Sequence, residues 1–341
     1  MTAEEKLNYQ TTLFENRLTK RFKHLKKWAK RSNVFCYRLY DKDIPEIPLV
    51  VDVYEHSETE ECFLQIALYE RPYEKSEEEE AQWLESMKFA AARSLLINPD
   101  NIIFKVRRKQ KGENQYEKNN DTSLTFTVKE QGQIFKVNLS SYLDTGLFFD
   151  HRPLRQMIRS SCQQKDVLNL FCYTGSFSVY AAQGKAKSVD SVDLSKTYLA
   201  WAEENFKLNG FDLKNNQEKY RFINKDVFTF LQESIDSKEK LYDIIVLDPP
   251  TFSNSKKTEN LLDINKDWPK FVSLCLKLLK PYGVLYFSTN SRRLNFYAEE
   301  LYTVYENSVS IVDITDKTIP EDFRNKKIHR CWEIKNNVQH Y

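Results

Sequence analysis

Hydrophobic and polar positions follow two different patterns along the chain, and the change between them falls near residue 140. The first part opens with an amphipathic helix whose apolar residues recur at helical spacing, at Leu18, Phe22, Leu25 and Ala29. Ser76 and Glu79 form a capping box that begins a second helix. Strand-like runs surround this helix, at 34–40, 49–55, 62–69, 101–107, 122–129 and 133–138. The mixture predicts a small α+β domain over residues 1–140.

The second part, residues 141–341, alternates buried apolar runs with helices. Strands are expected at 166–171, 188–193, 220–223, 243–248 and 284–288, and helices at 175–183, 196–209 and 263–279. Ser195 fits a helix N-cap, and Gly184 and Gly210 fit C′ positions after their helices. This alternation predicts an α/β fold with a doubly wound, mostly parallel sheet. Ligands of such sheets bind at the carboxyl ends of the strands.

Polar residues stand at the carboxyl ends of these strands. The first strand leads into a turn at 173–175, before a helix whose N-terminal N–H groups suit an anion. Asp193 ends the second strand, where such sites hold ribose hydroxyls, and Asp226 follows the third. Asp248 ends the fourth strand, and two prolines fix the backbone behind it. Any one acid could be a strand-end cap or a turn former, but three at successive strand ends outline a pocket for a ligand that contains adenosine.

Composition narrows the identity of this ligand. Only seven of the 341 residues are glycine, and neither G-x-G nor G-x-x-x-x-G-K-[ST] occurs, which excludes the dinucleotide fingerprint and the P-loop. A ligand without pyrophosphate needs a single anion site, for a carboxylate. S-adenosylmethionine therefore fits the predicted pocket better than a dinucleotide does.

Charge and cysteine usage indicate the compartment. The 51 basic and 49 acidic residues give a formal charge of only +2, so any affinity for nucleic acid must come from local clusters. The six cysteines are scattered without a C-x-x-C pair, which indicates neither a disulfide framework nor a zinc site. No secretory signal and no long apolar run is present. We expect a soluble cytoplasmic protein without a metal site or a membrane span.

Basic residues concentrate in three clusters, which we expect to bind RNA. The helix over 17–31 carries eight Lys or Arg residues and no acid, and the other clusters lie at 105–111 and 324–330. The candidate RNA contacts are Arg17, Arg21, Lys27, Arg107, Arg108, Lys326 and Lys327. For the first cluster, a solvated helix face and a membrane-surface helix are the alternatives.

Several motifs carry a family resemblance that covers nearly the whole chain. The stretch 166–210 resembles the cofactor half of class I methyltransferases that act on ribosomal RNA. The segments YLDTGLFFDHR, LDPPTFSNSKK and ITDKTIPEDFRNKKIHRCWEI are similar to the RlmK family, the guanine-N7 methyltransferase module of the bifunctional 23S rRNA enzyme RlmKL. The RlmL half and its THUMP domain have no counterpart in this sequence. The resemblance therefore implies no guanine-N2 methylation, which a separate partner protein would supply.

The resemblance also assigns roles to residues. It implies that residues at the carboxyl edge of the sheet hold S-adenosylmethionine: Arg152, Asn169, Phe171, Tyr173, Thr174, Gly175, Asp193, Leu194, Asp226 and Val227. It implies a catalytic face made of Asp248, Pro249, Pro250 and Phe252. Arg152 offers a bidentate fork to the methionine carboxylate, and an inter-domain salt bridge is its alternative role.

Reaction chemistry separates the related enzymes. Cytosine-C5 methyltransferases attack their base with a cysteine thiolate. The segments after the fourth and fifth strands contain no cysteine, and Cys275 falls inside a predicted helix as a buried structural thiol. Guanine N7 has an in-plane lone pair and no proton to remove, so its methylation needs only the positioning of an extruded base. The resemblance, with which this chemistry agrees, implies N7 methylation of a guanosine in 23S rRNA, free or in a pre-50S particle. Methylation of another base and a non-catalytic RNA-binding assembly factor are the alternatives.

Overall fold

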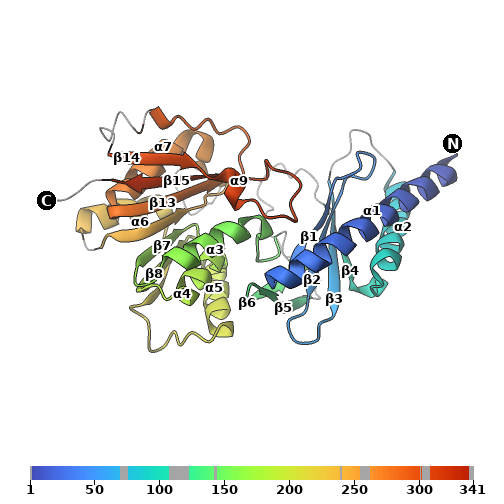
Figure 1. Cartoon of the computed structure of the whole chain (residues 1–341), viewed down its shortest axis with the longest axis horizontal. Coiled ribbons are helices and arrows are strands. Elements are labelled where there is room, and N and C mark those ends of the chain that lie inside the picture. Colours follow the sequence, from blue (N-terminus) through green and yellow to red (C-terminus); the bar gives the residue numbers. More distant parts are fainter. Residues whose placement is uncertain are drawn as a thin grey trace. The chain divides into compact units, whose positions relative to one another are not determined.

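A computed structural model describes the chain over residues 2–69, 76–106, 123–141, 144–238, 240–253, 262–299, 301 and 308–337. The chain forms two compact units (Figure 1). Unit 1 comprises Met1–Phe149 and the short segment Glu321–Arg324, and unit 2 comprises Asp150–Pro320 and Asn325–Tyr341. Residues 141–149 and 321–324, which the sequence assigned to the second domain, thus group with unit 1.

Unit 1 is built on a four-stranded sheet with the order β1-β2-β3-β4. Its strands are β1 (Cys36–Asp41), β2 (Leu49–Glu55), β3 (Cys62–Leu68) and β4 (Ile102–Val106). The first three are antiparallel, and β4 is parallel to β3. A separate hairpin joins β5 (Thr125–Glu130) to β6 (Gln133–Asn138). These strands lie within one to three residues of their predicted bounds.

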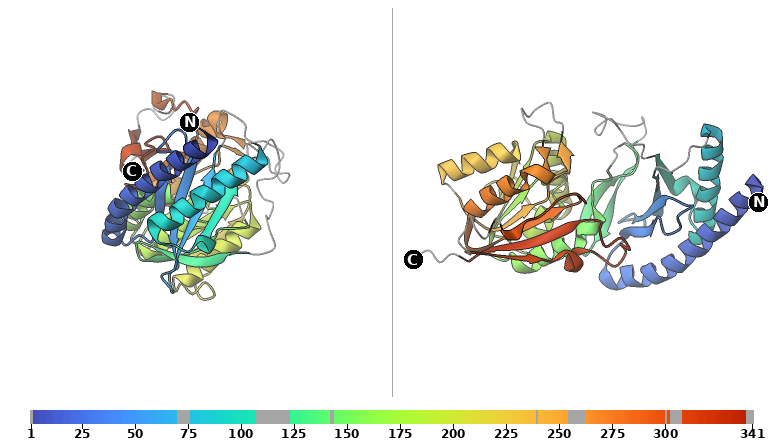
Figure 2. Two further views of the ribbon diagram at one scale, coloured as in Figure 1. Left: turned by 90° about the vertical axis from the view of Figure 1, so that its right-hand side faces the viewer. Right: turned by 90° about the horizontal axis from the view of Figure 1, so that it is seen from above.

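Two long helices, α1 (Ala3–Ser32) and α2 (Glu77–Leu95), run side by side across this sheet (Figure 2). The apolar stripe of α1 packs into one core with α2 and strands β1 to β3, and Leu18 and Leu25 are fully buried in it. The capping box of Ser76 and Glu79 begins α2 as predicted. Burial of one apolar stripe leaves the polar residues of α1 on its remaining faces.

The segment Glu321–Arg324 binds to unit 1 although it is distant in sequence. The Asp322 carboxylate is buried and accepts the backbone N–H of Arg38 at 3.0 Å. The Asp322 carbonyl accepts a guanidinium N–H of Arg21 at 3.1 Å. The Arg38 guanidinium lies over the Phe323 ring at 4.7 Å. These contacts explain why part of the C-terminal family motif belongs to the core of the first unit.

Unit 2 is an α/β domain with a seven-stranded sheet of order β14-β15-β13-β10-β7-β8-β9. Its strands are β7 (Asp166–Leu170), β8 (Ser188–Asp193), β9 (Tyr220–Asn224), β10 (Tyr242–Leu247), β13 (Leu279–Thr289), β14 (Val309–Asp313) and β15 (Arg330–Asn336). Strands β13, β10, β7, β8 and β9 are parallel, and β15 is antiparallel to both of its neighbours. Counted in chain order within the unit, the sheet runs 3-2-1-4-5-7-6. The predicted fold class is confirmed.

Helices cover both faces of this sheet (Figure 2). One layer consists of α3 (Arg152–Ser161), α4 (Ser176–Gln183) and α5 (Lys196–Leu208), and the other of α6 (Val227–Ser237) and α7 (Ile264–Lys277). A single turn, α9 (Thr315–Thr318), precedes β15. The sequence predicted α4, α5 and α7 but not α3, α6 or the antiparallel strand β15. No described helix has the length and apolar character that crossing a membrane requires.

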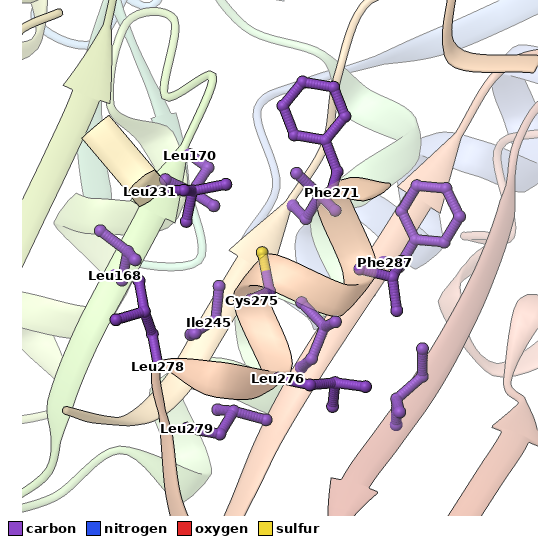
Figure 3. Close-up of a cluster of buried hydrophobic side chains, with 14 of the residues drawn as sticks. Leu168, Leu170, Leu231, Ile245, Phe271, Cys275, Leu276, Leu278, Leu279 and Phe287 are labelled. Atoms are coloured by element: carbon purple, nitrogen blue, oxygen red, sulfur yellow. The ribbon is translucent and has the colours of Figure 1, made fainter. Parts of the chain in front are cut away.

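The core of unit 2 lies where α6 and α7 pack on the central strands. Figure 3 shows Cys275 of α7 among leucine, isoleucine and phenylalanine side chains. Burial raises the pKa of the Cys275 thiol far above its usual range. The prediction of a structural thiol at this position is confirmed.

The glycines after the helices behave differently from each other. Gly210 adopts the predicted left-handed conformation, with φ of 79°. Gly184 is the C-cap of α4, with φ of −73°, and the left-handed residue is Lys185 after it, so the predicted C′ position of Gly184 is wrong by one residue. A Cβ at Gly184 would lie 2.3 Å from the carbonyl oxygen of Arg159 and 2.4 Å from the sulfur of Cys162. Gly184 is therefore required by the close approach of α3 to the end of α4.

Candidate active site

The order of the strands locates the crevice of unit 2. Strands β7 and β10 are neighbours at the centre of the sheet, and the chain winds outward from them in opposite directions. Such a topological switch point opens a crevice at the carboxyl ends of its two strands. The loops that follow β7 and β10 are the predicted cofactor loop and the Asp248 motif.

The loop after β7 has an unusual backbone. Phe171, Tyr173 and Gly175 have φ values of 54°, 51° and 74°, so three alternate residues are left-handed. For the two that are not glycine, this conformation costs roughly 1–2 kcal/mol each, and such strain concentrates at functional sites. Three N–H groups of this loop already donate within the protein: Cys172 to the Val192 carbonyl, Tyr173 to Asp193 and Gly175 to the Cys172 carbonyl. Gly175 is also the N-cap of α4, and a Cβ there would lie 2.7 Å from the Cβ of Ala202 on α5.

Asp193, at the end of β8, is tied to this loop. Its Oδ2 accepts the N–H of Tyr173 at 2.9 Å, and its Oδ1 accepts the N–H of Ser195 at 2.8 Å. Each oxygen has a second lone pair for another donor. Burial raises the pKa of Asp193, and the backbone hydrogen bonds oppose this increase. Ser195 is the N-cap of α5, as predicted. The arrangement suits a carboxylate that accepts hydrogen bonds from ribose hydroxyls.

The remaining cofactor candidates differ in accessibility. Asp226 is the N-cap of α6 and accepts the N–H of Thr229 at 3.0 Å, and Val227 after it is buried. Asn169 is buried within β7 and donates to the hydroxyl of Ser178 at 2.9 Å. The structure thus encloses Asn169 inside the sheet.

Two further candidates, Leu194 and Thr174, use their backbone carbonyls within the protein. The Leu194 carbonyl accepts from Asn224 and the Thr174 carbonyl accepts from Asn205, at 2.9 Å in each case. Arg152 is buried at the first position of α3.

Asp248 lies at the carboxyl end of β10, with a quarter (25%) of its side chain exposed. The Ser288 hydroxyl, from the adjacent strand β13, donates to its Oδ1 at 2.6 Å. The Nε2 atom of His151 lies 3.4 Å from its Oδ2. Pro249 is buried behind it, and Pro250 is exposed. The carboxylate is therefore held by two side chains and is open to a ligand.

The chain after Asp248 carries an exposed aromatic ring. Thr251 donates to the side-chain oxygen of Asn290 at 2.5 Å, which attaches this loop to the end of β13. Phe252 then pairs with Asp263 in a short ladder between β11 (Phe252–Ser253) and β12 (Leu262–Asp263). Phe252 is 58% exposed. Exposed aromatic rings can stack on unpaired bases.

Sequence reasoning missed two residues that lie against Asp248. His151 lies in the family segment YLDTGLFFDHR, but from that segment only Arg152 was predicted to have a role. Ser288 lies in β13 and contacts Asp248 only because β13 and β10 are neighbours.

None of the cysteines of unit 2 has the properties of a nucleophile. None of the six cysteines, all of which lie in the described residues, forms a disulfide, and the four in unit 2 are buried. Burial raises the thiol pKa of Cys172, and burial together with the nearby carboxylates of Asp248, Asp313 and Glu333 raises that of Cys331. A thiol with a raised pKa is protonated at neutral pH and is a poor nucleophile.

The basic residues of α1 fall into two classes. Arg17 pairs with Asp43 at 2.6 Å, and Arg21 donates to the backbone carbonyls of Leu39 and Asp322. These two predicted RNA contacts thus lie against the body of unit 1. Lys27 is exposed, as are six further Lys and Arg residues of α1: Lys6, Lys20, Lys23, Lys26, Lys30 and Arg31.

The other predicted RNA contacts belong to different segments. Lys326 and Lys327 of unit 2 are exposed. Arg107 and Arg108 lie outside the described residues.

A doubly wound sheet of this strand order, with a strained loop, a capped helix and acids at its carboxyl edge, is typical of S-adenosylmethionine-dependent methyltransferases. A family model described as S-adenosylmethionine-dependent methyltransferase matches residues 61–313. The crystal structure of SMU.776 complexed with SAH covers 95% of this chain and 81% of that one, with a TM-score of 0.71 and 23% identity.

Two curated relatives are more similar in sequence. The chain is 44% identical, over 95% of its length and 87% of the relative, to ribosomal RNA large subunit methyltransferase K of Neisseria meningitidis serogroup B. It is 43% identical to ribosomal RNA large subunit methyltransferase K/L of Shewanella loihica, over 95% of this chain but only 43% of that protein. The chain belongs to the S-adenosylmethionine-dependent methyltransferases and, among them, to the ribosomal RNA large subunit methyltransferase K family. Its cofactor is S-adenosylmethionine.

Proposed function

We propose that this protein transfers a methyl group from S-adenosylmethionine to N7 of a guanosine in 23S rRNA. The observation that carries the proposal is the composition of the face around Asp248: an open carboxylate, an exposed Phe252 and only neutral, buried thiols nearby. The relatives named above are large-subunit rRNA methyltransferases, which supports 23S rRNA as the substrate class. Naked 23S rRNA and a pre-50S particle are both candidate forms of it.

The cofactor would be held by the residues at the ends of β7, β8 and β9. The N-terminus of α4 favours its carboxylate. Asp193 would accept hydrogen bonds from the ribose hydroxyls. When bound, the cofactor supplies an activated methyl group on a sulfonium. Asn169, which is enclosed and donates to Ser178 of α4, would support the start of that helix.

The residues around Asp248 would position the base. Phe252 would stack on the extruded guanine, while Asp248 accepts from the N–H groups of its Watson–Crick edge. The N7 lone pair forms the new bond as the carbon–sulfur bond breaks, and no proton leaves the base. Positive charge moves onto the purine, and the Asp248 carboxylate favours that charge electrostatically. No thiolate and no general base is needed.

Nucleoside analysis of 23S rRNA tests this proposal. RNA from cells that lack this gene should lose one N7-methylguanosine, and the wild-type gene should restore it. Borohydride reduction followed by aniline cleavage then locates the nucleotide. Loss of 5-methylcytidine or another modified base instead would overturn the N7 assignment. Unchanged modification together with a ribosome-assembly defect would favour the non-catalytic assembly factor.

A further inference from the structure

A buried histidine, His151, lies beside the proposed catalytic carboxylate. It ends the short 3-10 turn η3 (Phe149–His151) and is the N-cap of α3, with φ of −85° and ψ of 4°. Its side chain makes no capping hydrogen bond, so the imidazole is not used to begin the helix. This residue is only 6% exposed. Nε2 lies 3.4 Å from Asp248 Oδ2 and 3.7 Å from Asp150 Oδ2.

The neighbours of His151 determine its tautomer. A neutral imidazole carries one hydrogen, on either Nδ1 or Nε2. Nε2 faces two carboxylate oxygens, which only accept, whereas Nδ1 has no hydrogen-bonding partner among the described residues. The hydrogen therefore belongs on Nε2, from which it points toward the carboxylates.

The charge state of His151 follows from its surroundings. Burial lowers the pKa of His151, and this effect exceeds the opposing effects of Asp248 and Asp150. His329, which precedes β15, and Arg155 of α3 lower the pKa further. The imidazole is therefore neutral at pH 7 and serves as a hydrogen-bond donor.

A second histidine fixes the plane of the first. The rings of His151 and His329 are stacked, with centroids 4.5 Å apart and an interplanar angle of 12°. His329 Nδ1 lies 3.0 Å from Asp150 Oδ2, and Nε2 lies 2.9 Å from the Thr318 hydroxyl. Asp150 is thus engaged by His329 at the shorter distance, which leaves Asp248 as the partner that His151 can orient.

The same geometry argues against a metal ion at this cluster. Asp150, His151 and His329 place one ligand atom each within 4.8 Å of one another. A metal lies in the plane of each imidazole that binds it, and two nearly parallel stacked rings have no common in-plane point close to both. Both nitrogens of His329 also have partners already.

We propose that His151 is a positioning residue for Asp248. Its Nε2–H and the Ser288 hydroxyl hold one carboxylate oxygen each, so that the other lone pairs of Asp248 face the target base. This inference rests on the proposed function of Asp248. Misplacement of a reacting partner by about 1 Å can cost on the order of 100-fold in rate, so a loose Asp248 should slow methyl transfer without weakening cofactor binding.

Two substitutions of similar polarity separate this role from simple packing. In His151→Gln, the amide nitrogen takes the place of Nε2 and can donate to Asp248. In His151→Asn, the amide nitrogen reaches only the place of Nδ1, on the side without a partner. Both are measured in the full chain, with 23S rRNA from cells that lack the gene. The readouts are the single-turnover rate of methyl transfer, the Kd for S-adenosylmethionine and the thermal unfolding midpoint.

We expect His151→Gln to keep most of the rate and His151→Asn to lose roughly 10- to 100-fold, with an unchanged Kd for S-adenosylmethionine in both. Ser288→Ala removes the other hydrogen bond to Asp248 and should show the same loss of rate. This variant keeps the test decisive if His151→Asn does not fold. Equal rates for the Gln and Asn variants, or a loss confined to cofactor affinity, would overturn the inference. So would loss of wild-type activity on treatment with a chelator.

The same experiment separates the inference from the proposed function. If the wild type methylates a base other than guanine at N7 and the Gln and Asn variants still differ, the N7 assignment fails while the role of His151 stands. If the wild type transfers methyl groups to guanine N7 and the two variants are equally active, the inference alone fails. A wild type that transfers no methyl group to rRNA overturns both.

Discussion

Asp248 combines fixed geometry with access to solvent. Ser288 and His151 contact one oxygen each, while a quarter of the side chain is open. A carboxylate held in this way can act by hydrogen bonding to the base and by its negative charge. The two contributions separate experimentally, because asparagine keeps an acceptor but loses the charge.

Substitution of Asp248 should therefore stop catalysis more than it affects cofactor binding. Asp248→Ala is expected to abolish methyl transfer, and Asp248→Asn to reduce it by roughly 100- to 1,000-fold, the range for removal of one preorganised electrostatic group. Calorimetry should give a Kd for S-adenosylmethionine close to that of the wild type. Unchanged turnover in Asp248→Ala would remove Asp248 from the catalytic face.

Asp193 makes cofactor affinity dependent on pH. Because burial raises its pKa, the carboxylate becomes protonated at a higher pH than an ordinary aspartate and then loses acceptor strength. Affinity for S-adenosylmethionine should fall as pH falls through this raised pKa. The contribution of Asp193 to the stability of the free protein has the opposite sign: it is present at low pH and is lost as pH rises through the raised pKa.

Asp193→Asn should remove this pH dependence. Loss of a hydrogen bond to a charged group costs about 1.5–3 kcal/mol, which corresponds to roughly 10- to 100-fold weaker binding of S-adenosylmethionine at neutral pH. Titration calorimetry at several pH values measures both effects. If the variant keeps the pH profile of the wild type, the titrating group is not Asp193.

At the scale of elements, the sequence predicted the features that depend on interactions between residues close together in the chain. The capping box at Ser76, the N-cap at Ser195 and the acids at the strand ends were recognised because each depends on neighbours in sequence. The contacts of Asp248 were not recognised, because Ser288 and His151 are 40 and 97 positions away and reach it only through sheet order. Strand β15 was not predicted, because the alternation of strands and helices in the sequence predicts parallel strands and β15 is antiparallel to its neighbours.

Arg17 and Gly184 illustrate the limits of composition and spacing. A basic run predicts an exposed RNA-binding face, but it does not tell which side of the helix meets the body of unit 1. Arg17 lies on the side that pairs with Asp43. A glycine after a helix predicts a left-handed residue, but Gly184 is required because α3 approaches it closely. Both outcomes depend on tertiary packing.

Two glycine substitutions test whether close packing at Gly184 costs more stability than the left-handed backbone at Gly210. Gly184→Ala places a methyl group against the backbone of Arg159 and should cost about 1–3 kcal/mol or more. In a unit of this size that lowers the unfolding midpoint by roughly 2–4 °C per kcal/mol. Gly210→Ala is the matched control, because no atom lies within 4 Å of its added Cβ and only the left-handed backbone opposes it. Thermal unfolding should show the larger loss for Gly184→Ala.

At the scale of the whole molecule, the formal charge of +2 hides an uneven distribution. Seven exposed Lys and Arg residues of α1 lie away from the apolar stripe, while Arg17 and Arg21 of the same helix are engaged within unit 1. Non-specific affinity for RNA comes from release of counterions by exposed cations. The exposed lysines, and not the engaged arginines, should therefore govern the salt dependence of binding.

Removal of two exposed lysines should lower the salt dependence of RNA binding by a definite amount. For single-stranded RNA, each phosphate contact contributes about 0.7 to the slope of log K against log salt. Lys23→Gln with Lys27→Gln should therefore reduce the slope by about 1.4 if both contact phosphates, with an unchanged unfolding midpoint. Arg17→Gln is the control: it breaks the pair with Asp43 and should lower stability while leaving the slope unchanged. Filter binding of a 23S rRNA fragment at several salt concentrations measures the slope. An unchanged slope in the lysine variant would exclude this face of α1 from the RNA interface.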